Sequence, residues 1–170
     1  MRLTELGREQ ALALGAAVGP VDLVAHTEFP RTRETAELAW PGTPTLVVRE
    51  LNEIAFGRFE GTSWHEGYDV WTTTAGPEDA CPGGGESRVA ATRRYVDGYR
   101  LLLRRSEERV AFVGHGAHIR LLLLARDGMR PTARLEGVDP AMAFSLAPDE
   151  LVRALELLDS WAVSPSFQAH

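Results

Sequence analysis

Residues Arg109 to Leu124 read RVAFVGHGAHIRLLLL, and this stretch decides the fold class. Its first apolar run, Val110 to Val113, is too short for a helix and is typical of a strand buried on both faces of a sheet. Two glycines then bracket His115, and the apolar residues that follow indicate the first turns of a helix. This order predicts an imidazole at the carboxyl edge of a sheet, where open α/β sheets bind ligands. The plainer alternative is a strand–helix turn in which the histidine only caps the helix.

Length, composition and charge limit the classes of protein to which this chain can belong. Its 170 residues, 44% hydrophobic and 25% charged, are typical of a globular protein, and we expect a single domain over residues 1–170. The net charge of −6 argues against nucleic acid or an anionic membrane as the main partner. The single cysteine, Cys81, excludes an internal disulfide, and no apolar stretch is long enough to span a bilayer, so we expect a cytoplasmic protein.

Helical patterns alternate with short apolar runs along the chain, which indicates an α/β fold. Strands are expected at residues 21–25, 45–48, 110–113 and 141–146, while residues 151–158 fit either a helix or a strand. Helices are expected at residues 5–18, 30–40, 86–106 and from 117 to the Asp127-Gly128 pair, and residues 64–74 allow a short one. In the first helix Thr4 is the expected N-cap, and the expected core contacts are Leu6, Leu12, Leu14 and Val18.

Arg31 and Glu53 lie in two further stretches that are suited to chemistry. Arg31 follows Pro30 at the start of a helix that comes directly after a strand, where its guanidinium fork and the helix N–H groups suit a phosphate. Glu53 lies in LNEIAFGRFEG, residues 51–61, whose apolar and aromatic side chains would raise a carboxyl pKa and suit a general acid. The plainer alternatives are a solvated arginine and a surface carboxylate.

A glycine-rich run, Gly83 to Gly85, leads through Glu86 and Ser87 into the helix expected at residues 86–106. Such a loop can cradle an anion, or its glutamate or serine can simply cap the helix. The arginines of that helix are expected to form a solvated outer face, because acidic residues follow them. They are Arg93, Arg94, Arg100, Arg104 and Arg105.

Taken together, these stretches form an ordered series of motifs. Residues 26–36 read HTEFPRTRETA, residues 51–61 LNEIAFGRFEG, residues 85–87 GES and residues 113–120 VGHGAHIR. The series resembles the histidine phosphatase superfamily, also called phosphoglycerate mutase-like, in family order from residue 3 to residue 126. The resemblance implies a three-layer α/β/α fold, a mostly parallel sheet and a phosphate pocket at the carboxyl ends of the strands.

The same resemblance implies roles for single residues. By motif position, Arg31 resembles the arginine that clamps the phosphate, and Glu53 resembles the proton donor to the leaving oxygen. His115 resembles the second active-site histidine, which contacts the transferring phosphoryl group. These three are the expected catalytic residues. The residues expected to contact the substrate are Arg31, His115, Gly116, Thr27 and Ser87.

One part of the family pattern is absent from these 170 residues. Family members begin with a central strand that ends in Arg-His-Gly, whose histidine becomes phosphorylated, whereas residues 1–4 here already lead into the first helix. The neighbours of that strand would lose a row of backbone partners, at about 1–3 kcal/mol for each unpaired buried amide. No other histidine is a credible substitute; the others are His26, His65, His118 and His170.

We therefore expect a reading frame upstream of the Met1 codon that encodes an apolar run ending in Arg-His. Sequencing of the gene tests this expectation. An in-frame stop codon directly before Met1 would contradict it.

The resemblance thus implies a phosphoric monoester hydrolase of the phosphohistidine type, which we expect to be inactive as these 170 residues because the nucleophilic histidine is absent. We expect no metal and no cofactor, since no Cys, Asp or Glu completes a metal site around His115 and His118. The expected partner is a small phosphorylated substrate, and an uncovered sheet edge would favour a homodimer. Phe56, Phe59 and Trp64 either line the substrate pocket or pack against the core. The alternative function is a non-catalytic phosphate-recognising or interaction module.

Overall fold

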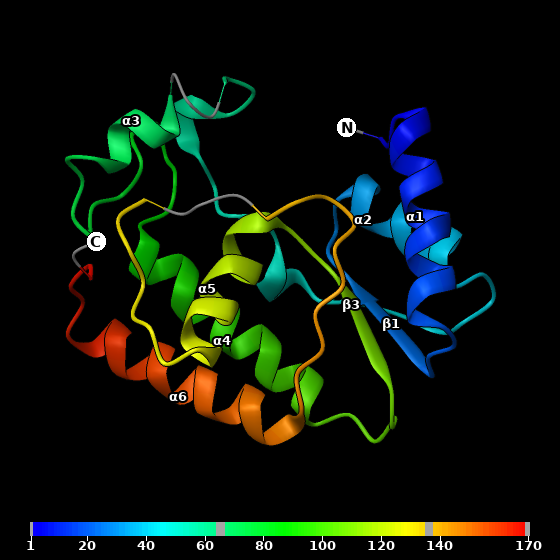
Figure 1. The fold of residues 1–170 in the computed structure, drawn as a ribbon. Helices are drawn as coiled ribbons and strands as arrows, with labels where there is room; N and C mark the ends of the chain where they lie inside the picture. Colours follow the sequence, from blue (N-terminus) through cyan, green and yellow to red (C-terminus); the bar gives the residue numbers. More distant parts are fainter. Residues whose placement is uncertain (1, 64–66, 135–137, 169–170) are drawn as a thin grey trace. The chain divides into compact units, whose positions relative to one another are not determined.

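The structure of the chain is a computed structural model that describes residues 2–63, 67–134 and 138–168 (Figure 1). It consists of two compact units, each assembled from segments that are far apart in the sequence. The first unit comprises Met1–Asn52, Asp97–His115 and Val138–Ser145, and the second comprises Glu53–Val96, Gly116–Gly137 and Leu146–His170. The expectation of one domain over residues 1–170 stays a prediction.

A parallel sheet of three strands belongs to the first unit. β1 (Leu23–His26) lies between β2 (Thr45–Val47) and β3 (Val110–Val113). All four residues of β1 are buried, whereas β3 is half-buried at every position. The prediction of burial on both faces is therefore wrong for β3 and fits β1, because β3 pairs with a strand on one side only among the described residues. The α/β class itself is confirmed.

Two helices of the first unit, α1 (Glu5–Val18) and α2 (Pro30–Ala39), lie side by side (Figure 1). Both begin and end within one residue of the predicted bounds. Thr4 caps α1 as predicted, since its hydroxyl oxygen accepts a hydrogen bond from the Gly7 amide at 3.1 Å. The Gly19-Pro20 pair follows α1 and stops it, as the sequence indicates.

The apolar core beside these helices consists of Val24 from β1 and Ala36 and Trp40 from α2 and its end. Leu14 and Val18 of α1 pack against it as predicted. The indole N–H of Trp40 donates to the carbonyl oxygen of residue 19 at 2.8 Å, so the one polar atom of this ring has a partner. The packing of α1 and α2 and the burial of β1 therefore depend on the same small apolar cluster.

The other two leucines predicted for this core, Leu6 and Leu12, are exposed to 63% and 55%. α1 buries Ala11 and Gly15 instead, and Gly15 lies directly against the backbone of Ala39. Residues four apart share one face of a helix, so the face that meets α2 is built on these two small residues. Leu6 and Leu12 point away from that face. The close approach of the α1 and α2 backbones decides which face of α1 is buried. The apolar pattern of the sequence does not encode this approach.

The second unit contains helices α3 (Tyr68–Thr72), α5 (Gly116–Arg126), α6 (Pro148–Val163) and the start of α4 (Arg88–Leu103). α5 and α6 pack against each other. Residues 151–158, for which the sequence fits two alternatives, belong to α6. Short 3₁₀ turns at Arg49–Leu51 and Gly57–Phe59 complete the described elements. Among the residues that the structure describes, no helix has both the length and the apolar character that crossing a bilayer would require.

The strand expected at residues 141–146 is not formed. Met142 and Phe144 are exposed, and Ala141 has a φ of 57°, which interrupts an extended run. The backbone groups of a strand need a partner strand, and within the described ranges none pairs with this segment. Apolar alternation alone was therefore a misleading signal here. Of the helix expected within residues 64–74, α3 is present, while Trp64 and His65 lie outside the described residues, as does His170.

Replacing Gly15 by alanine tests the close approach of α1 to α2. The added methyl group would collide with the carbonyl oxygen of Ala39, and backbone cannot move aside as a flexible side chain can. We expect Gly15→Ala to lower the free energy of unfolding by about 1–3 kcal/mol. Urea denaturation followed by circular dichroism measures this change.

Gly7→Ala in the same helix is the matched control. Its methyl group would meet only the side chains of Leu3 and Thr4. Helix propensity therefore predicts a gain in stability of about 0.5–1 kcal/mol. A similar effect of both substitutions would contradict the close helix contact.

Candidate functional site

The carboxyl edge of the sheet brings together residues that are far apart in the chain. β1 and β3 run parallel, and their register pairs His26 with Val113 at the ends of the two strands. Thr27 follows the first strand and His115 comes two residues after the second. Their side chains meet, with Thr27 Oγ1 2.8 Å from His115 Nε2, and both residues are buried. Strand pairing therefore positions the predicted histidine.

Arg31 reaches the same histidine from the first turn of α2. Its Nη2 atom lies 2.9 Å from Nδ1 of His115. The guanidinium also lies over the ring of Phe29, with 4.5 Å between its carbon and the ring centroid, and that ring contacts His115 edge-on. Of the predicted site residues, Arg31, Thr27 and His115 thus come together within the first unit. Phe29, which the sequence gives no role, forms the wall that orients two of them.

Hydrogen-bond donors and acceptors fix the state of this imidazole. A guanidinium has donors only, so His115 Nδ1 must accept the hydrogen bond from Arg31. The neutral ring then carries its proton on Nε2 and donates it to the hydroxyl oxygen of Thr27. Thr32 Oγ1 donates to the carbonyl oxygen of Phe29 at 2.9 Å, so the Thr27 hydroxyl donates in turn to Thr32 Oγ1 at 2.8 Å. The result is a directed chain of hydrogen bonds that starts at the guanidinium.

This arrangement suits an oxyanion. The guanidinium carries a permanent positive charge and several N–H donors, and part of it is buried, so water screens it less than at the surface. An anion that approaches Arg31 can accept hydrogen bonds from these donors in place of the imidazole nitrogen of His115. Thr32 was missed from the sequence, where the spacing Thr27 to Thr32 is the one signal that could have suggested it. His26 completes the edge, its Nδ1–H donating to the carbonyl oxygen of Thr27 at 2.7 Å.

The remaining predicted residues belong to the second unit. Glu53 is half-buried, and its Oε1 atom accepts a hydrogen bond from the Ile54 amide at 3.1 Å. Ser87 Oγ accepts from the Ala90 amide at 3.1 Å, which is the capping alternative, and a substrate contact of Ser87 stays a prediction. Gly116 is the first residue of α5. The predicted roles, catalysis for Glu53 and substrate binding for Ser87 and Gly116, therefore rest on the sequence alone.

The glutamate of the glycine-rich loop makes an internal clamp in the second unit. Glu86 accepts from the Ala55 amide at 3.0 Å and binds both Nε and Nη2 of Arg94, at 2.9 and 2.6 Å. Burial alone would raise the pKa of Glu86, but these hydrogen bonds hold it below its usual range. The side chain of Arg94 is 25% exposed, so the prediction that this arginine lies on a solvated face is wrong. The physical reason is that the Glu86 carboxylate binds the guanidinium of Arg94.

Three other side chains singled out by the sequence have structural partners. Cys81 is buried, burial raises the pKa of its thiol, and Sγ donates to the carbonyl oxygen of Phe56 at 2.9 Å. Both features oppose a role as a nucleophile. Phe56 packs edge-on against Tyr68, and Phe59 packs against Trp71. Their part in a substrate pocket stays a prediction.

One known protein family matches most of this chain. The sequence profile described as "Histidine phosphatase superfamily (branch 1)" matches residues 1–150. The chain belongs to this superfamily. The prediction made from the order of the motifs is therefore confirmed.

Named relatives within the histidine phosphatase superfamily include mutases and phosphatases. The chain is 28% identical to 2,3-bisphosphoglycerate-dependent phosphoglycerate mutase of Brucella ovis, with 93% of this chain and 86% of the relative covered. It is also 28% identical to the solved structure of a mycobacterial glucosyl-3-phosphoglycerate phosphatase, with a TM-score of 0.63 over 83% of this chain and 77% of the other. The alpha-ribazole phosphatase of Shigella flexneri shares the fold, with 23% identity and a TM-score of 0.63 over 85% of this chain and 87% of that one.

The clamp between Glu86 and Arg94 predicts a pH-dependent contribution to stability. Because the folded state lowers the pKa of this carboxyl, the stabilisation is present at neutral pH and is lost as the pH falls through the native pKa. We expect Glu86→Gln to lower the free energy of unfolding by about 1–3 kcal/mol at pH 7. The difference from wild type should shrink as the pH falls below the usual carboxyl range. Urea denaturation at several pH values measures both effects.

Glu37→Gln is the control for this experiment. Glu37 is exposed on α2 and forms an i,i+4 pair with Arg33. Such pairs contribute little, so its substitution should leave the pH profile of stability unchanged. A pH profile of Glu86→Gln that runs parallel to wild type would contradict the clamp.

Proposed function

We propose that the chain is a phosphoric monoester hydrolase of the phosphohistidine type, which acts on a small phosphorylated substrate in the cytoplasm. The observation that carries the proposal is the hydrogen bond of 2.9 Å between Arg31 Nη2 and His115 Nδ1 at the carboxyl edge of the sheet. A guanidinium and an imidazole in contact are groups that bind a phosphate and stabilise charge on it during transfer. The names of the relatives, a phosphoglycerate mutase and a glucosyl-3-phosphoglycerate phosphatase, support a phosphate ester as substrate.

The proposed roles follow from the donors at this edge. Arg31 donates to two phosphate oxygens once the anion replaces the imidazole as its acceptor. His115 takes up a proton at Nδ1 and then donates to a third oxygen, while Thr27 holds the opposite nitrogen. Motif position alone assigns to Glu53 the role of giving a proton to the leaving oxygen. Release of an alcohol, rather than an alkoxide, makes the displacement feasible at neutral pH.

The covalent step needs a further imidazole. Its nitrogen attacks phosphorus as the bond to the leaving oxygen breaks, and water then hydrolyses the phosphohistidine. Membership of the superfamily implies that this nucleophile is the histidine of an Arg-His-Gly segment at the end of a strand, and the 170 residues do not contain that segment. The sheet of the first unit can pair with such a strand, because β3 has a partner strand on one side only among the described residues. An added strand would complete the hydrogen bonding of β3.

The second candidate function is a non-catalytic phosphate-recognising or interaction module. One observation favours it: the 170 residues contain no Arg-His-Gly motif. Arginine and imidazole donors can bind an anion without transferring it. The two candidates therefore share the anion site and differ in turnover.

Turnover of 4-nitrophenyl phosphate by two chains separates the candidates. We expect no turnover by the 170 residues and turnover by a chain extended upstream to include Arg-His-Gly. In the extended chain, Arg31→Ala should lower kcat/KM by about 10²-fold or more, because it removes the charge that stabilises the transferring phosphoryl group. Product analysis distinguishes hydrolysis, which releases inorganic phosphate, from transfer to a second substrate. Absence of turnover in both chains, with phosphate still bound, would support the recognition module.

Binding of vanadate tests the anion site in the 170 residues themselves. Vanadate mimics the transferring phosphoryl group, and the mycobacterial phosphatase, 29% identical to this chain, has been solved with VO₃. We expect His115→Ala and Arg31→Ala each to weaken vanadate binding by about 10- to 100-fold, the effect of a lost charge-assisted hydrogen bond. Isothermal titration calorimetry measures the affinity.

Arg33→Ala is the matched control for this titration. Arg33 lies on the same helix as Arg31 but is exposed and pairs with Glu37. Its substitution should leave the vanadate affinity unchanged. Unchanged affinity in His115→Ala would remove His115 from the site.

A further inference from the structure

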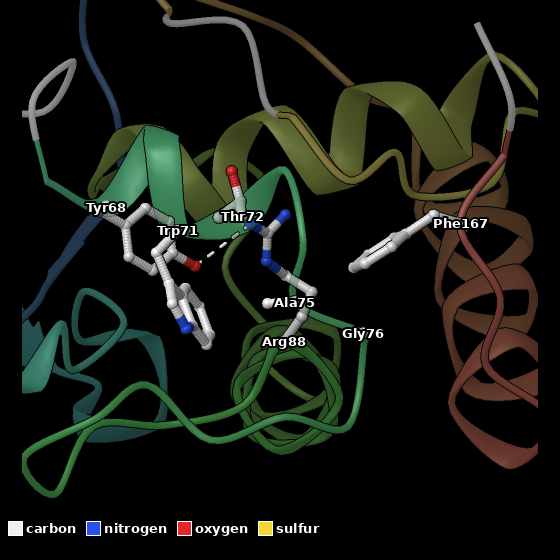
Figure 2. Close-up of a pocket in the computed structure, with 7 residues that line it drawn as sticks. All are labelled: Tyr68, Trp71, Thr72, Ala75, Gly76, Arg88 and Phe167. Atoms are coloured by element: carbon white, nitrogen blue, oxygen red, sulfur yellow. Dashed lines mark hydrogen bonds between the residues drawn. The ribbon is translucent and has the colours of Figure 1, made fainter.

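A recess in the second unit is separate from the groups assigned above. It lies between α3, the start of α4 and Phe167, and it encloses about 200 Å³ with its open mouth included. Figure 2 shows the guanidinium of Arg88 between Tyr68 and Trp71 on one side and Phe167 on the other. Aromatic rings thus flank a single charged group. Its inner part is narrow, with room for about one water-sized group.

The guanidinium of Arg88 is incompletely bonded. The residue is only 5% exposed. Its Nη2 atom donates to the hydroxyl oxygen of Tyr68 at 3.2 Å, while Nε and Nη1 are buried and have no hydrogen-bond partner within the described part of the chain. Buried donors normally have acceptors, because water can no longer serve them. Two unsatisfied donors on one buried side chain therefore indicate that an acceptor binds here.

The charge of Arg88 is also unbalanced. Asp69 forms an ion pair with Arg134, and Glu86 forms one with Arg94, so these nearby carboxylates have other partners. Over residues 2–63, 67–134 and 138–168, no carboxylate forms an ion pair with Arg88.

Tyr68 does not supply a negative charge either. Burial raises the pKa of its hydroxyl, although the adjacent guanidinium partly opposes this, so the group is neutral at pH 7. The hydrogen bond from Nη2 to Tyr68 therefore gives the guanidinium a neutral partner and no counter-ion. An anion from outside the described residues would compensate its positive charge.

The position of Arg88 on its helix adds to the imbalance. It is the first residue of α4, a helix of 16 residues, and the N-terminus of a helix carries a partial positive charge. A cation at this end is destabilising, and burial increases the effect. The stability of the helix thus gives no reason for an arginine at this place. Both the helix end and the guanidinium attract a negative charge to the recess.

We propose that this recess binds a small carboxylate through the guanidinium of Arg88. A carboxylate carries one negative charge, and one of its oxygens can accept from Nε or Nη1, which point along different edges of the guanidinium. The rings of Tyr68, Trp71 and Phe167 line the recess in which such an anion would meet the guanidinium. The narrow inner recess favours a carboxyl group over a larger oxyanion. The proposal does not depend on phosphatase activity, because none of its residues belongs to the Arg31–His115 site.

Acetate is the probe for this proposal. The thermal midpoint of the 170-residue chain is followed as acetate replaces chloride at constant ionic strength. Acetate at several times its Kd should raise the midpoint by about 2–4 °C, since a ligand that binds only the folded state stabilises it. The intrinsic fluorescence of Trp71 should change over the same concentration range. A wild-type midpoint and fluorescence that do not respond to acetate would overturn the proposal.

Arg88→Met is the decisive variant. It keeps an apolar chain of similar length and removes the charge, so the response of the midpoint to acetate should be lost. In chloride alone its midpoint should not fall below that of wild type, because an unbalanced buried charge has been removed. An acetate response equal to that of wild type would overturn the proposal. If this variant does not fold, Trp71→Phe keeps the test open, because the acetate-dependent fluorescence signal must disappear in it; a signal that persists would place the anion elsewhere.

Two controls separate this site from general anion effects and from the proposed phosphate site. Arg104 is exposed just beyond α4, and Arg104→Met should keep the full response to acetate. Arg31→Ala should keep the acetate response while losing vanadate affinity. Loss of the acetate response in Arg31→Ala but not in Arg88→Met would assign the carboxylate to Arg31 and overturn the proposal. Failure of vanadate binding alone would leave the acetate result intact and would count only against the proposed function.

Discussion

The parallel pairing of β1 with β3 is the constraint on which the first unit depends. Its register places His26 opposite Val113, and this alone brings Thr27 within hydrogen-bond distance of His115, 88 residues away in sequence. A slip of one residue would turn every side chain of β3 to the other face of the sheet. The imidazole and the hydroxyl would then no longer meet. Backbone hydrogen bonds therefore determine side-chain geometry at the candidate site.

Helix packing supplies the second half of the site. α2 begins at Pro30, whose ring has the backbone angle of a first helical residue, and this fixes Arg31 in the first turn. The face of α1 that meets α2 carries Gly15, which permits contact with the backbone at Ala39. Phe29 then holds the guanidinium and the imidazole against one ring. A charged side chain is thus oriented by apolar contacts before any anion arrives.

Features that depend on local order along the chain could be predicted from the sequence. The bounds of α1, α2 and β3, the Thr4 cap and the pairing of Arg31 with His115 all follow from motifs or end signals read in order. Features that depend on a neighbour could not. Residues 141–146 have the pattern of a strand but no partner strand in the part of the chain that the structure describes, and Arg94 lies away from the solvated face because it binds Glu86. Tertiary contacts determine whether residues 141–146 pair as a strand and where Arg94 lies, and no single segment contains those contacts.

The directed hydrogen bonds around His115 restrict the path of a proton. The series ends at the carbonyl oxygen of Phe29, which has no hydrogen to donate. Thr27 and Thr32 therefore cannot pass a proton on to a further group. The imidazole therefore has a single basic position, the nitrogen that faces Arg31. Proton exchange with solvent or substrate must take place on that side, and the threonine side serves to anchor the ring.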